Sequence, residues 1–275
     1  MVRAVIFDLD GTLVQTEKLK ALSYAIAAQK LLSLDEPDSR AIEAYRRIVG
    51  SSREVASRFV MEQLDLDTKL VPLMAQYGVS EPWEALTAMR ATIYKQMVAD
   101  PEVVRTNQWP HTVAFLELVR KRGCKTGLAT MSYRLEALHV LRSLGLEDKL
   151  DVILAREDVE HPKPDPEIYV SACRLLGVSS PECLAIEDSP AGIRAALAAG
   201  ITTIGVATPF TRAALQEAKL LPVSCFVEEP EMLVSSVERC LKGSHGFKSC
   251  VVCFGEIDHD RWSIKCLLHV SLHGI

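Results

Sequence analysis

The chain lacks a hydrophobic run of about 20 residues, which is the length that a membrane-spanning helix needs. It also lacks an excess of basic residues, because 36 Asp and Glu outnumber 31 Lys and Arg and give a net charge of −5. The residues up to Phe7 are too few for a secretory signal before Asp8 interrupts them. We therefore expect a cytoplasmic protein that binds neither membranes nor nucleic acid.

Size and cysteine content give two further expectations. A chain of 275 residues with 48% hydrophobic content can bury a sizeable core, in one large domain or in one domain with a smaller companion. Cytoplasmic proteins keep their thiols reduced, so we expect the eight cysteines to be reduced thiols.

The stretch Val5–Thr12 is the most informative part of the sequence. The apolar, strand-favouring residues Val5–Phe7 lead into Asp8 and Asp10, and Gly11 then ends the strand. In a parallel α/β sheet, ligands bind at this carboxyl end of the strands. Two adjacent carboxylates repel each other unless a cation offsets their charge, and Mg²⁺ prefers oxygen ligands. The stretch therefore predicts a magnesium site.

The pattern after this stretch divides the chain into parts. Residues 17–100 carry apolar side chains at helical spacing, which predicts a small bundle of roughly four helices. From 101 to 243, short apolar strands alternate with helices that end at glycines, the pattern of a parallel, doubly wound sheet. The predicted fold is thus an α/β, Rossmann-like core, made of residues 1–16 and 101–243, with an α-helical cap inserted after the first strand. The predicted core strands are 2–7, 125–130, 152–154, 183–186 and 202–206, and the predicted core helices are 111–122, 134–144, 166–176 and 191–199.

Three further polar clusters follow the predicted core strands. They are Thr130-Met131-Ser132, the proline-rich loop His161–Pro166 with Lys163, and Glu187-Asp188. With the two aspartates they supply acids for a cation, a hydroxyl and N–H groups for an oxyanion, and a fixed ammonium. This set suits phosphoryl transfer, in which positioning and electrostatics do most of the catalysis. In such a reaction one aspartate can attack phosphorus, and the other can move protons.

The ordered motifs resemble a known family. The chain is similar to the haloacid dehalogenase superfamily of phosphatases through Asp8–Thr12, Thr130, Lys163 and Glu187-Asp188, and the helical insert resembles its subgroup with an α-helical (C1) cap. Within that subgroup, the runs 186–193 (IEDSPAGI) and 163–166 (KPDP) resemble the β-phosphoglucomutase branch. The resemblance covers about residues 2–240.

The resemblance implies roles for the acidic residues. Asp8 matches the nucleophile and a Mg²⁺ ligand, while Asp10 matches the general acid/base and gives a second ligand through its carbonyl oxygen. Asp188 matches a further metal ligand, with Glu187 beside it, bound directly or through water. Because the dehalogenating branch lacks an acid at the position of Asp10, the resemblance argues against dehalogenation.

The resemblance also implies a substrate site. Thr130, the Met131 amide and Lys163 match the phosphate cradle. In the cap, Arg53 matches an arginine that contacts the distal part of the substrate, and an arginine suits a second phosphate or a carboxylate. Lys20 could help to bind an anionic substrate.

Two cap positions depart from the mutase pattern. Val49 stands where a mutase-like loop has a lysine, and Lys20 stands where mutases have a histidine that couples cap closure to proton transfer. Both departures favour a phosphatase over a mutase.

Other interpretations of these residues remain open. Arg53 could be a solvated helix arginine, Lys20 plain surface charge, and Thr130 a helix N-cap. An Asp-x-Asp pair also occurs in glycosyltransferases and in calcium loops, although Gly11 comes too early for an EF-hand. We treat the three histidines before residue 244, His111, His139 and His161, as structural because they have no metal-like partners nearby in sequence.

The tail, residues 244–275, does not fit the family pattern. Cys250, Cys253, Cys266 and His269 have a spacing that some zinc sites use. The alternatives are a hairpin added to the core and a poorly ordered extension.

The sequence as a whole predicts a Mg²⁺-dependent phosphatase of a small phosphorylated metabolite, such as a sugar phosphate, acting through a phosphoaspartate on Asp8. One alternative is a sugar phosphomutase that uses the same intermediate. Another is a non-catalytic protein that binds a phosphorylated ligand. A site covered by its own cap needs no partner chain, so we expect a monomer, with a homodimer as the alternative.

Overall fold

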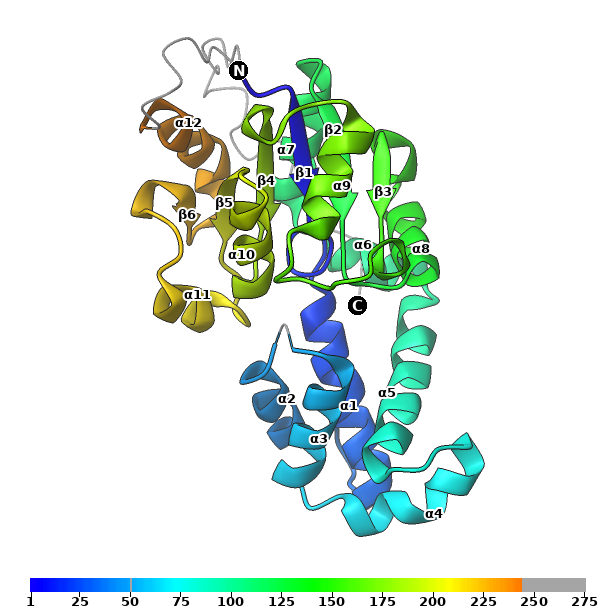
Figure 1. The fold of residues 1–275 in the computed structure, drawn as a ribbon. Helices are drawn as coiled ribbons and strands as arrows, with labels where there is room; N and C mark the ends of the chain where they lie inside the picture. The colour runs from blue at the N-terminus through cyan, green and yellow to red at the C-terminus, as the bar shows by residue number, and fades with distance from the viewer. Residues whose placement is uncertain (50, 244–275) are drawn as a thin grey trace, which may run out of the picture.

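The computed structural model describes residues 1–49 and 51–243, so the predictions for the tail lie outside the described residues. Within these ranges, six parallel strands form one sheet in the order β3-β2-β1-β4-β5-β6 (Figure 1). They are β1 (Ala4–Phe7), β2 (Lys125–Ala129), β3 (Val152–Leu154), β4 (Cys183–Glu187), β5 (Thr202–Val206) and β6 (Phe226–Val227). Since β1 pairs with β2 on one side and β4 on the other, the chain reverses its strand order at β1, where such sheets bind ligands.

Helices cover both faces of this sheet, and the alternation of side chains along β1 shows why. Val5 and Phe7 belong to one buried cluster, whereas Ala4 and Ile6 belong to another, as expected when successive side chains point to opposite faces. Helices α9 (Glu167–Leu176) and α10 (Pro190–Ala198) pack on one face, and α7 (Pro110–Lys121) and α12 (Leu233–Gly243) on the other. The remaining core helices are α6 (Pro101–Thr106), α8 (Arg134–Leu144) and α11 (Arg212–Ala218).

The predicted helical insert lies between β1 and β2. Its described residues form five helices, not roughly four: α1 (Thr16–Leu32), α2 (Ser39–Arg46), α3 (Arg53–Gln63), α4 (Asp67–Tyr77) and α5 (Pro82–Val98). The predicted number was too low because Leu66 and Asp65 make a sharp turn between α3 and α4 without a glycine or proline to mark it. These helices share their own buried cluster, which includes Tyr24, Tyr45 and Leu86. In Figure 1 the insert lies beyond the tip of the β1 arrow, at the carboxyl end of the sheet.

The core elements follow the sequence pattern closely, with α8, β3 and β5 at their predicted bounds. Elements α6, α11, α12 and β6 were not predicted. The strand β6 has two residues and α6 has six, so neither is long enough to show a periodic pattern.

The expectation of reduced cysteines is wrong for one pair. Cys225, just before β6, and Cys240, in α12, form a disulfide with their Cα atoms 5.2 Å apart. Packing of α12 against the 3₁₀ turn Val223–Cys225 brings the two residues together across 15 positions of sequence.

Among the described residues, every helix is too short or too polar to cross a bilayer.

Candidate active site

The predicted site residues stand at the ends of three neighbouring strands. Asp8 directly follows β1, and its N–H donates to the Ile186 carbonyl oxygen of β4 at 3.0 Å. Glu187 ends β4, Asp188 follows it, and Thr130 follows β2. The parallel sheet therefore gathers residues that are up to 180 positions apart in the sequence at one edge.

Lys163 reaches into this edge from the loop before α9. Its Nζ donates to Asp8 Oδ1 at 2.8 Å, to the Ala129 carbonyl at 2.8 Å and to Glu187 Oε1 at 2.5 Å. Tyr169 of α9 donates its hydroxyl to the same Glu187 oxygen at 2.7 Å. Burial opposes the charged ammonium, but the charges of Asp8 and Glu187 outweigh burial and raise the Lys163 pKa. Lys163 is therefore a fixed cation against the predicted nucleophile.

One ammonium does not balance the acids around it. Carboxylate oxygens of Asp8, Glu187 and Asp188 lie within 4.8 Å of one another, and all three residues are buried. Burial raises the pKa of Asp8 to about 8, with Lys163 opposing this and Glu187 adding to it. Burial, together with the charges of Asp8 and its acidic neighbours, raises the Asp188 pKa well above its usual range.

The donor set fits a hard divalent cation. The buried Asp188 Oδ2 has no hydrogen-bond partner among the described residues, which leaves its lone pairs available to a ligand. Several buried carboxylate oxygens around one point are the ligands that Mg²⁺ takes. A bound cation would stabilise the charged forms of Asp8 and Asp188, which burial disfavours.

Two glycines leave room for the carboxylates of Asp188 and Glu187 to lie against the backbone. Gly11 has φ +86°, and a Cβ at this position would lie 2.0 Å from Asp188 Oδ2. A Cβ on Gly192 of α10 would lie 2.0 Å from Glu187 Oε1. The space beside both carboxylates therefore depends on these glycines.

Asp10 lies in a second group of polar side chains. The hydroxyls of Thr16 and Ser132 donate to its carboxylate, and Lys20 Nζ lies 3.1 Å from Asp10 Oδ1 and 3.6 Å from Glu17. Burial would raise the Asp10 pKa, but Lys20 and the hydroxyls outweigh burial, so the pKa is lowered. The interpretation of Lys20 as plain surface charge is wrong, because helix α1 directs it onto the Asp10 carboxylate.

Sequence reasoning assigned no role to several residues around these acids. Ser132 and Thr16 bind Asp10, the buried Glu17 faces Lys20, and Tyr169 supports Glu187. Burial raises the pKa of Glu17 above its usual range. A weak signal existed, since Ser132 follows Thr130 by two positions and Thr16-Glu17 begin the insert directly after the first motif.

Thr130 is buried, and its hydroxyl accepts a hydrogen bond from the Ser132 N–H at 3.0 Å. The N-cap of α8 is Tyr133, so the interpretation of Thr130 as an N-cap is wrong. Met131 packs partly buried against the core, and the role of its amide stays a prediction.

Arg53 connects the cap to the core. It begins α3, and its guanidinium binds Glu136 of α8 at 2.9 Å and lies 4.5 Å from the centre of the Tyr133 ring. Tyr133 directly follows Ser132, so Arg53 lies at the rim of the Asp10 group. The Arg53 side chain is 40% exposed, and its contact with substrate stays a prediction.

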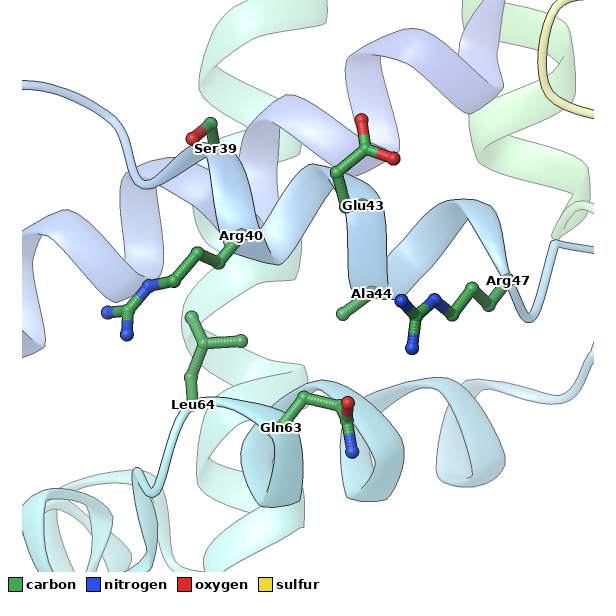
Figure 2. A pocket seen from close by; sticks show the side chains of 7 residues that line it. All are labelled: Ser39, Arg40, Glu43, Ala44, Arg47, Gln63 and Leu64. Atoms are coloured by element: carbon green, nitrogen blue, oxygen red, sulfur yellow. The ribbon is translucent and has the colours of Figure 1, made fainter.

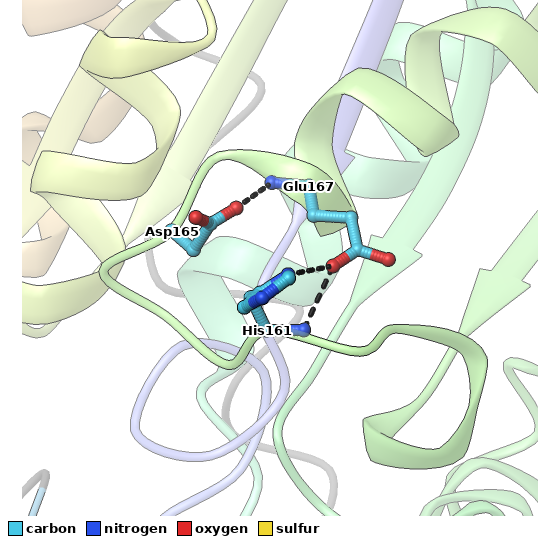
Figure 3. Close-up of side chains that lie close together, drawn as sticks. All are labelled: His161, Asp165 and Glu167. Carbon is cyan, nitrogen blue, oxygen red and sulfur yellow. Dashed lines mark hydrogen bonds and ion pairs between the residues drawn. The ribbon is translucent and has the colours of Figure 1, made fainter.

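A second acidic cluster lies on the loop that carries Lys163. His161, Asp165 and Glu167 have potential ligand atoms within 4.8 Å of one another, so His161 does have possible metal ligands beside it (Figure 3). However, Glu167 accepts the N–H groups of Glu160 and His161, and Asp165 accepts the N–H of Glu167. These hydrogen bonds stabilise the conformation of the loop, which explains why the three residues lie close together.

A surface cavity of about 260 Å³ lies in the cap, between α2 and the end of α3. Figure 2 shows Arg40 and Arg47 at its two ends. It is lined by Ser39, Arg40, Glu43, Ala44, Arg47, Gln63 and Leu64. None of the residues at the strand ends lines it, so it is separate from the candidate active site.

Comparison with known proteins gives consistent matches. A family model described as haloacid dehalogenase-like hydrolase matches residues 2–200. The chain is 32% identical over 201 residues to a phosphorylated carbohydrates phosphatase from Thermotoga maritima, covering 73% of this chain and 83% of that protein. It is 30% identical over 204 residues to a β-phosphoglucomutase from Bacillus subtilis, covering 74% and 83%.

Solved structures agree with these matches. A β-phosphoglucomutase from Clostridium difficile superposes with a TM-score of 0.65 at 25% identity, covering 88% of this chain and 98% of that one.

Proposed function

Since this chain belongs to the haloacid dehalogenase-like hydrolase family, we propose that it is a Mg²⁺-dependent phosphatase of a small phosphorylated metabolite. The proposed substrate is a sugar phosphate or a similar organic phosphate, cleaved through an aspartyl phosphate on Asp8. The observation that carries the proposal is the buried contact of Lys163 with Asp8 and Glu187, beside the unpartnered oxygen of Asp188. A relative named for phosphorylated carbohydrates supports the substrate class.

The residues of the chain divide the chemistry among themselves. Asp8 would attack phosphorus, and Lys163 would hold both that carboxylate and the phosphoryl oxygens, which carry the dispersed negative charge. The Thr130 hydroxyl and the Met131 amide would bind further phosphoryl oxygens. Glu187 and Tyr169 would keep Lys163 in place.

Asp10 would move the proton at the leaving oxygen and later take one from water. Thr16 and Ser132 orient its carboxylate, and the nearby ammonium of Lys20 favours the ionised form. The ionised form suits the hydrolytic step, and protonation of the leaving group requires that Asp10 first gain a proton.

Asp8, the Asp10 carbonyl oxygen and Asp188 would hold Mg²⁺, with Glu187 beside them. Bound Mg²⁺ supplies positive charge that reduces the repulsion between a carboxylate and a phosphate dianion.

We propose residues 17–100 as a cap domain and residues 1–16 and 101–243 as the core domain. The separate buried cluster of the five insert helices supports this division. Opening of the cap would admit substrate, and its closure would exclude water. Arg53 and Lys20 would then face the part of the substrate that is not transferred, as their contacts with the Asp10 group and its rim suggest.

A sugar phosphomutase is the second candidate, because the relatives include β-phosphoglucomutases. Both activities begin with the same phosphoaspartate, and they differ in the acceptor. A mutase returns the phosphoryl group to the sugar, whereas a phosphatase passes it to water.

The test uses the full chain with Mg²⁺ and a panel of sugar phosphates and other organic monoesters. We expect release of inorganic phosphate, together with the dephosphorylated product identified by NMR. Isomerised sugar phosphate without free phosphate would instead identify a mutase. Failure to turn over any member of the panel would favour a non-catalytic binding protein.

A variant tests the nucleophile. Asp8→Asn keeps the size of the side chain but removes the attacking charge, so kcat should fall by at least about 10³-fold. Far-UV circular dichroism would verify its fold. Retained turnover in a folded Asp8→Asn protein would exclude Asp8 as the nucleophile.

A further inference from the structure

Two thiols that the candidate active site does not use lie together in the core. Cys173 belongs to α9, and Cys183 is the first residue of β4. Both are buried, with 4% and 0% of their surface exposed, and neither is in a disulfide. Their neighbours in this cluster include Ala172 and Leu176.

The two sulfur atoms are close to bonding distance. Cys173 Sγ and Cys183 Sγ are 3.2 Å apart and share a hydrogen bond. A disulfide has an S–S length of about 2.05 Å, so its formation needs an approach of roughly 1 Å. Such a shift is small for side chains that are already in contact.

We propose that Cys173 and Cys183 form a reversible oxidation site, at which a hydroperoxide converts the dithiol into a disulfide that links α9 to β4. This site goes beyond the proposed phosphatase function, and its chemistry needs no phosphorylated substrate.

The reaction balances with one hydroperoxide. The Cys173 sulfur attacks a peroxide oxygen, the O–O bond breaks, and the departing alkoxide takes the thiol proton, which leaves a sulfenic acid on Cys173. The Cys183 sulfur then attacks the Cys173 sulfur, the S–O bond breaks, and the departing hydroxide takes the second thiol proton as water. Two thiols lose two electrons and two protons, and the hydroperoxide becomes one alcohol and one water.

The surroundings favour Cys173 as the sulfur that reacts first. The hydrogen bond with Cys183 lowers the Cys173 pKa and, with burial, raises that of Cys183. A hydrogen bond with the Ser180 side chain also lowers the Cys173 pKa. Ser180 lies in the 3₁₀ turn Ser180–Glu182, whose residues are half-buried or exposed, so a small peroxide would approach from this side.

The bond would join two elements that support the candidate active site. Tyr169 lies one helical turn before Cys173 on α9 and donates to Glu187, the last residue of β4. Oxidation would therefore link α9 covalently to β4. These two elements carry Tyr169 and Glu187, and Glu187 is the partner of Lys163.

The test treats the native full chain with hydrogen peroxide, blocks remaining thiols and maps the peptides by mass spectrometry without reduction. We expect a Cys173–Cys183 linked peptide that lacks two hydrogen atoms relative to the separate peptides and disappears with a thiol reductant. The Cys225–Cys240 peptide, linked before and after treatment, is the internal reference. A ring closed across ten residues should also raise the melting temperature by roughly 5 °C relative to the protein before oxidation.

Variants separate this pair from other cysteines. Cys183→Ser should abolish the linked peptide and leave a sulfenic acid on Cys173 that a dimedone probe traps, while Cys124→Ser, outside the pair, should form the link normally. Cys183→Ala is the second variant if the serine does not fold. The proposal is overturned if the native protein oxidises elsewhere without forming the link, or if Cys173 proceeds to a sulfinic acid with Cys183 present. Phosphatase assays are not involved, so failure here leaves the proposed function untouched.

Discussion

At the scale of single residues, the candidate active site is a balance of buried charges. Lys163 meets Asp8 and Glu187, and Lys20 meets Asp10 and Glu17. Each ammonium opposes the cost of burying carboxylates, which would otherwise gain protons. The two groups differ in outcome, because the Asp8 pKa is raised to about 8 and the Asp10 pKa is lowered. Their opposite shifts support different roles for the two aspartates.

The first prediction concerns Lys20. Replacing it in Lys20→Met removes the charge that favours ionised Asp10, so the Asp10 pKa should rise and kcat/KM should fall roughly tenfold. Carbon-13 NMR titration of the Asp10 carboxyl and steady-state kinetics measure the two effects. Lys18→Met is the matched control, because Lys18 is exposed on the same helix. An unchanged Asp10 titration in Lys20→Met would contradict the charge coupling.

The second prediction concerns pH and Glu182. Hydrogen bonds from the Ser179 N–H and hydroxyl, with Arg3, lower its pKa from 4.5 to about 2. The folded state therefore favours the ionised form, whose stabilising effect is complete above about pH 4.5 and disappears as the pH falls towards about 2.

Melting temperatures measured against pH would show this effect. Glu182→Gln should melt below the parent protein at pH 6, and the difference should shrink as the pH falls below 4.5. Glu217→Gln, at an exposed position of α11, is the control. A difference that stays constant down to pH 2 would show that the carboxylate charge is not responsible.

At the scale of elements, α8 is the core helix that meets the cap. Tyr133 and Glu136, at its start, contact Arg53 of α3, and His139 contacts the Val98 carbonyl at the end of α5 at 2.6 Å. A second contact places Arg46 of α2 over the Phe210 ring. The Arg53–Glu136 ion pair is half-exposed, whereas Leu19 of α1 and Val98 of α5 are buried in the cluster that fills the core.

The third prediction tests this junction. Arg53→Gln removes the ion pair and the stacking contact, so exchange of the Ala137 amide in the first turn of α8 should accelerate by up to about fivefold. Hydrogen-exchange NMR without substrate measures it. Arg58→Gln is the control, because Arg58 pairs with Glu54 inside α3 and does not reach the core. Equal acceleration in both variants would show that α3, not the junction, had been disturbed.

At the scale of the whole molecule, Asp8 and Asp188 lie side by side at the ends of the two central strands, β1 and β4. Asp8 follows β1 and Asp188 follows β4, so a cation between them would bridge the middle of the sheet just below the cap. Its binding should stabilise the folded state, since the unfolded chain does not hold these oxygens together.

The fourth prediction follows from this bridge. Mg²⁺ at about 100 times its dissociation constant should add about 2.7 kcal/mol and raise the melting temperature by roughly 5–10 °C, and a chelator should reverse the shift and stop turnover. Asp188→Asn should lose most of the shift. Asp165→Asn, in the exposed cluster of Figure 3, should keep it. If only Asp165→Asn lost the rise in melting temperature, the metal would bind at that loop and not at Asp8 and Asp188.

Local sequence determined much of this protein. The run from Val5 to Asp10 specifies a buried strand that ends in acids, and the glycine stops after α8 and α9 mark where helices give way to strands. Such signals lie within a few residues and depend on backbone propensities and on side-chain periodicity, which a linear sequence displays. The order of the four motifs then indicated their meeting at one edge, because parallel strands end together.

Only the tertiary structure decided which side chains meet across elements. Lys20 reached Asp10 because α1 starts beside the β1 loop, and Arg53 reached Glu136 because the start of α3 meets the start of α8. The same holds for the disulfide of Cys225 with Cys240 and for the thiol contact of Cys173 with Cys183. These pairs have no periodic or neighbouring signal, since their distances are set by the packing of whole elements and not by the backbone between them.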